Sequence, residues 1–147
     1  LWDSHERTVL EARTVLNESF IPSKNHWERI QEPEEILCRA KSLLDGLLRD
    51  YPDVKSIGLT GQMHGIVYTD QEGRHVSPLY TWQDGRGSLP EFNGRSLTDL
   101  IKEQAGFTTF SGYGLVTHLY HVKKRQVPEG SVSICTIADY LGAFGSC

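Results

Sequence analysis

The feature that most constrains the fold is an amphipathic helix that the sequence predicts between Pro33 and Pro52. Apolar residues recur along it at helical spacing, namely Ile36, Leu37, Ala40, Leu43, Leu44, Leu47 and Leu48. Pro33 suits the first helical turn, and the two glutamates after it complement the positive end of the helix dipole. Because such a stripe must be buried against another element, the chain needs a layered fold around it.

Segments typical of strands alternate with further helices along the rest of the chain. The predicted strands are 7–17, 54–60, 65–70, 75–82 and 132–137. The predicted helices run from Ser96 to Gly106, through Leu115 to Val122, and over 138–144. A turn at 70–73 suggests a hairpin, in which Pro78 indicates an edge strand or a bulge. This alternation predicts an α/β layer architecture with some antiparallel pairing.

Composition excludes several classes of protein. The 147 residues suffice for one domain with one core, and their net charge of −4 argues against binding to nucleic acid or an anionic membrane. No apolar run reaches the ~18 residues of a membrane span. Cys38, Cys135 and Cys147 are widely spaced, which favours a reduced, cytoplasmic protein over a disulfide framework or a zinc site. Because the chain starts at Leu1 and stops at Cys147, we expect it to be a piece of a longer protein.

Several familiar catalytic motifs are incomplete. The sequence has no phosphate-binding P-loop, and Gly112-Tyr113-Gly114 starts like a dinucleotide loop but lacks the next glycine, so a loop or helix-start role is favoured. His118 and His121 are three residues apart without an accompanying acidic ligand, so surface or half-buried histidines are favoured over a metal pair. No G-x-S-x-G turn supports a nucleophilic serine.

Two polar clusters remain, and each directly follows a predicted strand. Gln62, Met63 and His64 lie in GLTGQMHG, and Gln83, Asp84 and Arg86 lie in TWQDGRG. Ligand sites of α/β sheets favour strand ends and the loops that leave them. These side chains supply the directed donors and acceptors that a polyhydroxylated ligand needs. The alternative is structural, with Asp84 and Arg86 paired to each other and His64 a satisfied core histidine.

The two clusters carry a resemblance to a known family. IGLTGQMHGIVYTD, followed by PLYTWQDGR, resembles the N-terminal domain of the FGGY carbohydrate kinases, with both motifs in the family's order and close to its spacing. The flanking stretches HWERIQEPEEILCRA, GFTTFSGYGLVTHLYHVKK and ICTIADYL resemble the family as well. Within it, W-Q-D-G-R and S-G-Y-G look more similar to the sedoheptulokinases than to the xylulokinases.

The resemblance implies a fold and a set of site residues. The expected fold is a partial actin-like (ribonuclease H-like) α/β domain with a mixed sheet, flanking helices and its first strands missing. Residues 1–147 would be part of the sugar-binding N-terminal domain, with the C-terminal ATP-binding domain absent. The implied substrate-binding residues are Gln62, Met63, His64, Gln83, Asp84, Arg86 and Tyr113.

The resemblance also implies an activity for the parent protein. The parent would transfer the γ-phosphate of ATP, with Mg²⁺, to a hydroxyl of a small-molecule ketose, with a seven-carbon ketose favoured over xylulose. The family's D-x-G-T motif, its catalytic aspartate and its ATP-binding motifs are absent, so we expect this chain alone to be inactive and to bind neither ATP nor a metal. The alternative is a non-catalytic carbohydrate-binding or regulatory module. For partners, we expect self-association of the chain through unpaired sheet edges, or a dimer of the parent.

Overall fold

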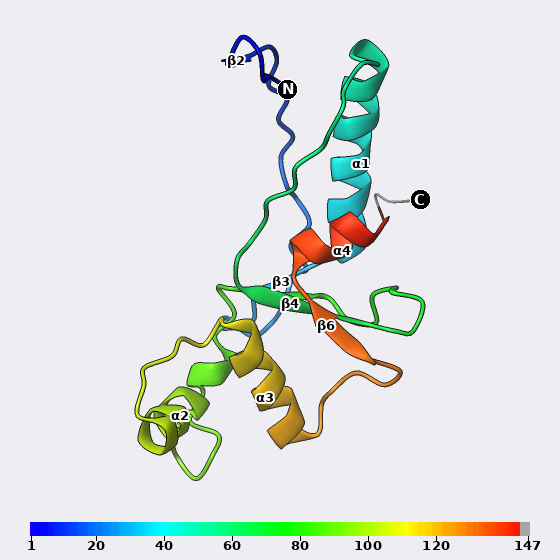
Figure 1. Cartoon of the computed structure of the whole chain (residues 1–147). Coiled ribbons are helices and arrows are strands. Elements are labelled where there is room, and N and C mark those ends of the chain that lie inside the picture. The colour runs from blue at the N-terminus through cyan, green and yellow to red at the C-terminus, as the bar shows by residue number, and fades with distance from the viewer. Residues whose placement is uncertain (145–147) are drawn as a thin grey trace.

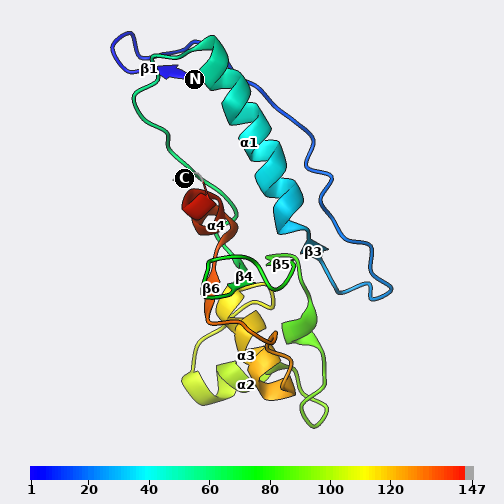
Figure 2. The ribbon, with the colours of Figure 1, turned by 90° about the vertical axis from the view of Figure 1, so that its right-hand side faces the viewer.

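A four-stranded sheet lies at the centre of the structure, a computed structural model that describes residues 1–144 (Figure 1). Its strand order is β3 (Ile30–Gln31), β5 (Leu79–Thr81), β4 (Gly65–Thr69) and β6 (Ser133–Cys135). Helices α1 (Pro33–Asp50) and α4 (Ile137–Phe144) lie on one side, and α3 (Gly114–Lys124), with α2 (Leu97–Ala105) beside it, lies on the other (Figure 2). The predicted α/β class with flanking helices is confirmed.

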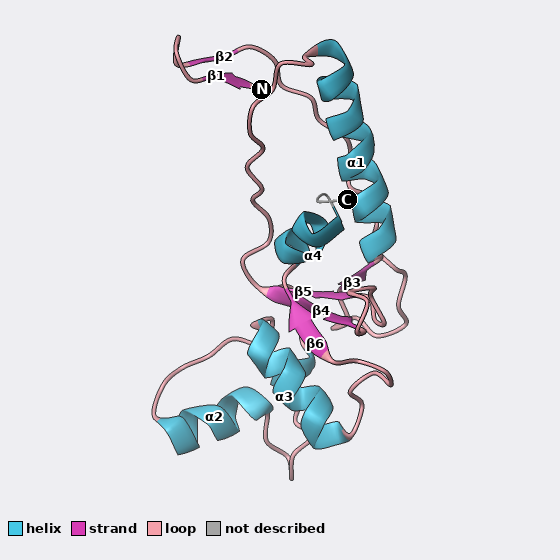
Figure 3. Cartoon of the chain, turned by 45° about the vertical axis from the view of Figure 1, so that its right-hand side comes forward, coloured by secondary structure: helices cyan, strands magenta, loops and turns pink. Residues whose placement is uncertain are grey.

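Every strand pair among the described residues is antiparallel, so the parallel pairs of the expected mixed sheet do not occur there. A separate small ribbon, β1 (Trp2–Asp3) with β2 (Thr8–Val9), lies near the far end of α1 from the sheet (Figure 3).

Strand β4 is covered on both faces, which explains why all five of its residues are buried. Val67 joins one core with Leu79, Ile137 and Tyr140, against which Ile36 and Leu37 of α1 pack. Tyr68, on the opposite face, contacts α3 through His118 and His121. Successive side chains of a strand point to opposite faces, so one short strand links both helical layers. A second core joins α2 and α3 through Leu97, Val116 and Tyr120.

The helix boundaries follow the predicted caps. Pro33 occupies the first turn of α1. The Ser96 side chain accepts a hydrogen bond from the Asp99 N–H at the start of α2, and Gly106 ends α2 with a positive φ of 74°. Thr136 caps α4 through Asp139 in the same way. The ends at Pro33, Ser96 and Gly106 were predicted because capping depends on residues close in sequence, whereas the Thr136 cap was not among the predictions.

Two predicted strands are wrong: one is much shorter than predicted and the other does not form. Of 7–17, only Thr8–Val9 pairs, and 54–60 forms no strand at all. The second segment is an extended coil from α1 towards β4 (Figure 1), with Ile57 and Leu59 exposed. Strand-forming side chains do not make a strand without a neighbouring backbone to pair with, and no described strand lies against this segment.

The predicted hairpin is confirmed, but its return strand is interrupted. Ile66 pairs with Tyr80, and Thr69 forms an isolated bridge to His75, so two residues of β4 oppose four of the returning segment. This bulge contains Pro78, and the Ser77 hydroxyl there accepts the Tyr68 N–H in place of a backbone carbonyl. The edge-strand alternative is wrong, because β5 lies between β3 and β4.

Candidate functional site

The register of two central strands brings both polar motifs to one end of the sheet. Gly65, the first residue of β4, pairs with Thr81, the last residue of β5. Gln62–His64 therefore enters the sheet where Trp82–Arg86 leaves it. The sequence analysis predicted that each motif directly follows a strand. This is confirmed for Trp82–Arg86 after β5 but wrong for Gln62–His64, because 54–60 is coil and the motif instead precedes β4.

Gly65 is required at this corner by its backbone. Its φ is +104°, in the region that residues with a Cβ rarely adopt, and an added Cβ would meet the Tyr80 carbonyl oxygen at 2.6 Å. Few other contacts hold the corner in place. The Gln62 Nε2 donates to Gln31 Oε1 at 2.9 Å, while the Gln62 Oε1 is buried without a partner. Met63 is 81% exposed.

A third loop completes this end of the molecule. The Tyr113 ring stacks on His64 with 4.2 Å between ring centroids and 24° between ring planes. Two glycines allow that approach: a Cβ on Gly112 would collide with the Trp82 backbone, and one on Gly114 with the Ile66 side chain. Tyr113, predicted from the resemblance, thus lies beside His64.

Asp84 is the most enclosed predicted residue, at 1% exposure. Its Oδ1 accepts from the Arg86 N–H (3.1 Å) and Nε (2.6 Å), and its Oδ2 accepts from the Arg29 N–H and Arg86 Nη2, both at 3.1 Å. These four bonds fill the acceptor positions of a carboxylate. The structural alternative considered for Asp84 and Arg86, that they pair with each other, describes their contacts here.

Arg86 lies in the short 3-10 helix η1 (Arg86–Ser88) and is 5% exposed. Besides Asp84, its guanidinium hydrogen-bonds the His121 Nε2 and approaches Glu28 Oε1 at 3.4 Å. The guanidinium carbon, Cζ, lies 4.3 Å from the ring centroid of Tyr80. Burial opposes the charge, but the Asp84 carboxylate outweighs it, so the pKa of Arg86 is above its ordinary value.

His121 is 2% exposed and belongs to this buried network. Desolvation, reinforced by the Arg86 charge, lowers the pKa of His121 to about 4. Desolvation likewise raises the pKa of Tyr80 and Tyr68. At neutral pH the network therefore holds one cation, Arg86, facing the Asp84 carboxylate, with a neutral imidazole beside it.

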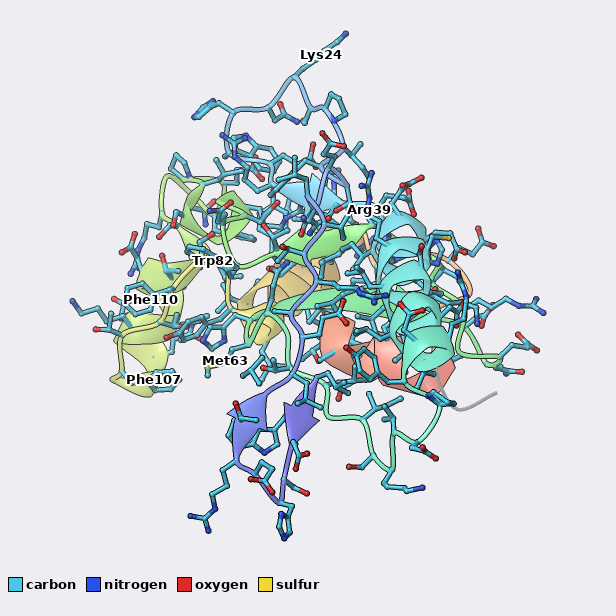
Figure 4. All side chains as sticks on the ribbon, turned by 90° about the horizontal axis from the view of Figure 1, so that it is seen from above. Lys24, Arg39, Met63, Trp82, Phe107 and Phe110 are labelled. Atoms are coloured by element: carbon cyan, nitrogen blue, oxygen red, sulfur yellow. The ribbon has the colours of Figure 1, made fainter. Side chains whose placement is uncertain are left out.

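Gln83, next to buried Asp84, is exposed. It lines a pocket of about 330 Å³ together with residues of the segment that precedes β3, namely Phe20, Ile21, Pro22, Ser23, Glu28 and Arg29. Met63 and Trp82 lie on one side of the molecule with Phe107 and Phe110 (Figure 4), and all four are exposed. The site end therefore offers both polar atoms and apolar rings.

Sequence reasoning missed four contributors: Trp27, Glu28, Gln31 and His121. The first three lie in HWERIQ, for which the sequence analysis predicts no strand, although Gln31 is in β3 and buried. His121 was predicted to be at the surface or half-buried, which is wrong. Its spacing from His118 was a usable signal, because residues three apart share a helix face, and both bond the Tyr68 hydroxyl.

Within residues 1–144, no group of three or more His, Cys, Asp or Glu side chains could hold a metal ion. Cys38 and Cys135 are free thiols, and Cys147 lies outside the described residues. Among the described helices, none has the length and apolar character needed to cross a membrane.

Comparison with known proteins identifies relatives. No protein-family model matches the chain. Human sedoheptulokinase is 34% identical over 134 residues, which is 78% of this chain and 27% of the relative. Xylulose kinase of Escherichia coli is 36% identical over 83 residues, or 53% of this chain and 16% of the relative. The chain is homologous to the FGGY-type carbohydrate kinases.

The fold agrees with this homology. The crystal structure of Plasmodium falciparum glycerol kinase superimposes with a TM-score of 0.71 at 18% identity, covering 95% of this chain and 30% of that one. The expected actin-like kinase fold is thus confirmed for the part of the domain that this chain represents. The chain spans about a quarter of the length of human sedoheptulokinase.

Proposed function

We propose that this chain is part of the sugar-binding domain of an ATP-dependent carbohydrate kinase. The observation that carries the proposal is the Gly65–Thr81 pair, which sets the two kinase-like motifs side by side at one end of the sheet. His64, Gln83 and Tyr113 leave polar atoms and ring faces at that end. Such a surface matches a sugar, which offers hydroxyls to polar atoms and C–H groups to rings.

Within this proposal the predicted residues have different parts. Gln62, Met63, His64, Gln83 and Tyr113 would contact the sugar. A sugar hydroxyl that reaches Asp84 would have to share an oxygen with Arg29 or Arg86, because protein donors already occupy both oxygens. Arg86 would orient Asp84 and, through it, the loop that carries Gln83.

ATP and Mg²⁺ would be bound by the remainder of the parent protein. Phosphoryl transfer relies on positioned cations around the phosphates and on a group that accepts the hydroxyl proton. The donor set of residues 1–144 does not fit MgATP, since it has neither a phosphate-binding glycine loop nor a carboxylate cluster for the metal. We therefore assign this chain a part in sugar binding and no part in the transfer step.

The sugar that we favour for the parent is a seven-carbon ketose, with xylulose second. The support is the extent of the two matches, which cover 78% of the chain for sedoheptulokinase and 53% for xylulose kinase. We propose a cytoplasmic location, in line with the three widely spaced cysteines.

The test is a substrate panel on the full-length parent, with ADP release as the readout. We expect turnover with a seven-carbon ketose, and weaker turnover with xylulose. Replacing exposed Gln83 (Gln83→Ala) should raise the KM for the sugar by roughly tenfold, the value of one lost hydrogen bond. Gln71→Ala, which alters an exposed glutamine in the 70–73 turn, is the matched control. A parent that releases no ADP with any ketose, glycerol or pentitol would refute the proposal.

The competing function is a non-catalytic carbohydrate-binding module. Reading the source gene on either side of this chain separates the two functions. A D-x-G-T motif upstream and an ATPase domain downstream favour the kinase, whereas stop signals at both ends favour the module.

Exposed Ile57 and Leu59 on an unpaired segment would also let the isolated chain self-associate, which sedimentation velocity measures.

A further inference from the structure

We infer that His121 is a positioning residue for the sugar site: as a neutral imidazole protonated on Nδ1, it fixes the Arg86 guanidinium and thereby the Asp84 loop. The inference rests on the proposed function, because the loop that is held carries Gln83. His121 hydrogen-bonds Arg86 and packs on Tyr80 of β5, and the proposed route to the loop is the Arg86 bond.

Arg86 is held in place both from within its own loop and from outside it. The loop is tied to the segment before β3 by hydrogen bonds from the Arg29 N–H to Asp84 Oδ2 and from the Gly85 N–H to the Trp27 carbonyl. The Arg86 guanidinium is bound by Asp84 from within the same loop, two residues away, so that pair alone does not tie the guanidinium to another element. The contacts from outside the loop are Glu28 at 3.4 Å, the rings of Trp27, Tyr80 and Tyr120, and the His121 Nε2. Among these, His121 supplies the short directional bond, and it comes from helix α3.

The donors and acceptors present set the direction of each hydrogen bond around His121. Arginine only donates, so the His121 Nε2 must be an acceptor and its ring proton must be on Nδ1. That Nδ1–H then donates to the Tyr68 hydroxyl at 3.0 Å. The Tyr68 hydrogen is left for His118 Nδ1, also at 3.0 Å. The hydrogen bonds from Arg86 through His121 and Tyr68 to His118 thus all run in one donor-to-acceptor direction, which is assigned from the partners of each group.

The charges around His121 favour its neutral form. The ionisable groups around His121 are Arg86, Tyr68, Tyr80, Tyr120 and His118, with Asp84 and Glu28 beyond Arg86. A proton on Nε2 would remove the acceptor and set a second cation against Arg86. Burial and the Arg86 charge both disfavour that proton, which agrees with the pKa of about 4.

The experiment compares three variants of the full-length parent. His121→Gln keeps an acceptor near the Nε2 position, and His121→Phe keeps a ring without one. His5→Phe, in the exposed turn between β1 and β2, is the control. For His121→Phe we expect the KM for the sugar to rise roughly tenfold while the KM for ATP stays unchanged. His121→Gln should restore most of the loss, and His5→Phe should match the wild type.

Two results would overturn the inference while leaving the proposed function intact. One is an active parent in which His121→Phe leaves the sugar KM unchanged. The other is an equal loss in His121→Phe and His121→Gln, which would indicate packing alone. An inactive wild-type parent would instead refute the proposed function, and the inference with it.

A measurement on the unmodified protein covers the case in which His121→Phe does not fold. Nitrogen-15 NMR of histidine side chains reports which ring nitrogen carries the proton. We expect the His121 signal, assigned by its loss in His121→Gln, to show a neutral Nδ1–H ring at pH 7. A neutral Nε2–H ring or a protonated ring would overturn the inference.

Discussion

The two motif loops at the site end differ in how firmly they are held. The corner at Gln62–His64 has an exposed methionine, one glutamine hydrogen bond and one ring stack. The loop at Gln83–Arg86 contains a buried ion pair joined to helix α3 through His121. The two motifs, which meet at one end of the sheet, thus serve different purposes. The first presents exposed side chains, and the second holds its own loop in place through buried contacts. Substitutions in the second loop should cost far more stability.

The largest effect should come from breaking the buried ion pair. Arg86→Met leaves the Asp84 carboxylate buried without its cation, and we expect the free energy of unfolding to fall by about 3–5 kcal/mol. Met63→Ala, in the exposed corner, should stay within about 0.5 kcal/mol of the wild type. Urea unfolding of each variant measures both values. If the two variants lose equal stability, the contrast between the loops is wrong.

The next effect is a dependence of stability on pH that arises in the buried network. The folded pKa of His121, about 4, is below the ordinary 6.5. As pH falls through 6.5 the unfolded chain takes up a proton that the folded chain does not. The stability contributed by neutral His121 is therefore present above pH 6.5 and lost progressively down to pH 4, by at most about 3 kcal/mol.

The measurement is urea unfolding across this pH range for the wild type and for His121→Gln, which cannot titrate there. The difference between the two slopes isolates His121 from the carboxylates. Parallel slopes between pH 4 and 6.5 would contradict a buried, neutral His121.

A smaller effect tests how the third loop supports the exposed corner. Gly112→Ala places a methyl group against the Trp82 backbone, which cannot move without shifting β5, so we expect a loss of about 1–3 kcal/mol. Gly58→Ala is the control, because nothing lies within 4 Å of its added Cβ and its φ is not positive. Thermal unfolding of both variants checks this, and an unchanged midpoint for Gly112→Ala would argue against the close approach.

The smallest effect concerns the glutamine pair beneath the corner. Gln62→Ala removes the donor to the buried Gln31 Oε1, and we expect a loss of about 1 kcal/mol. Gln83→Ala, which removes an exposed side chain, should change stability by less than about 0.5 kcal/mol. Denaturant midpoints compare the two. A Gln83→Ala loss larger than that of Gln62→Ala would reverse the order that burial predicts.

Much of the secondary structure was predictable because its causes are local. The stripe after Pro33, the Ser96 cap and the Gly106 stop each involve residues within a few positions of one another, and each is confirmed. The segment 54–60 was not predictable in this way. Its composition favours a strand, but pairing depends on a distant backbone, and no described strand lies against it.

For the candidate site, the sequence by itself determined which residue types make up the two polar motifs, and it placed one of them correctly after a strand, whereas the strand predicted before Gln62 does not form. The tertiary structure alone decided that Gly65 pairs with Thr81, that Asp84 faces inward while Gln83 faces outward, and that His121 bonds Arg86. The physical reason is range. Caps and helical stripes depend on near neighbours, whereas register and burial arise from contacts between segments such as Arg86 and His121, 35 residues apart.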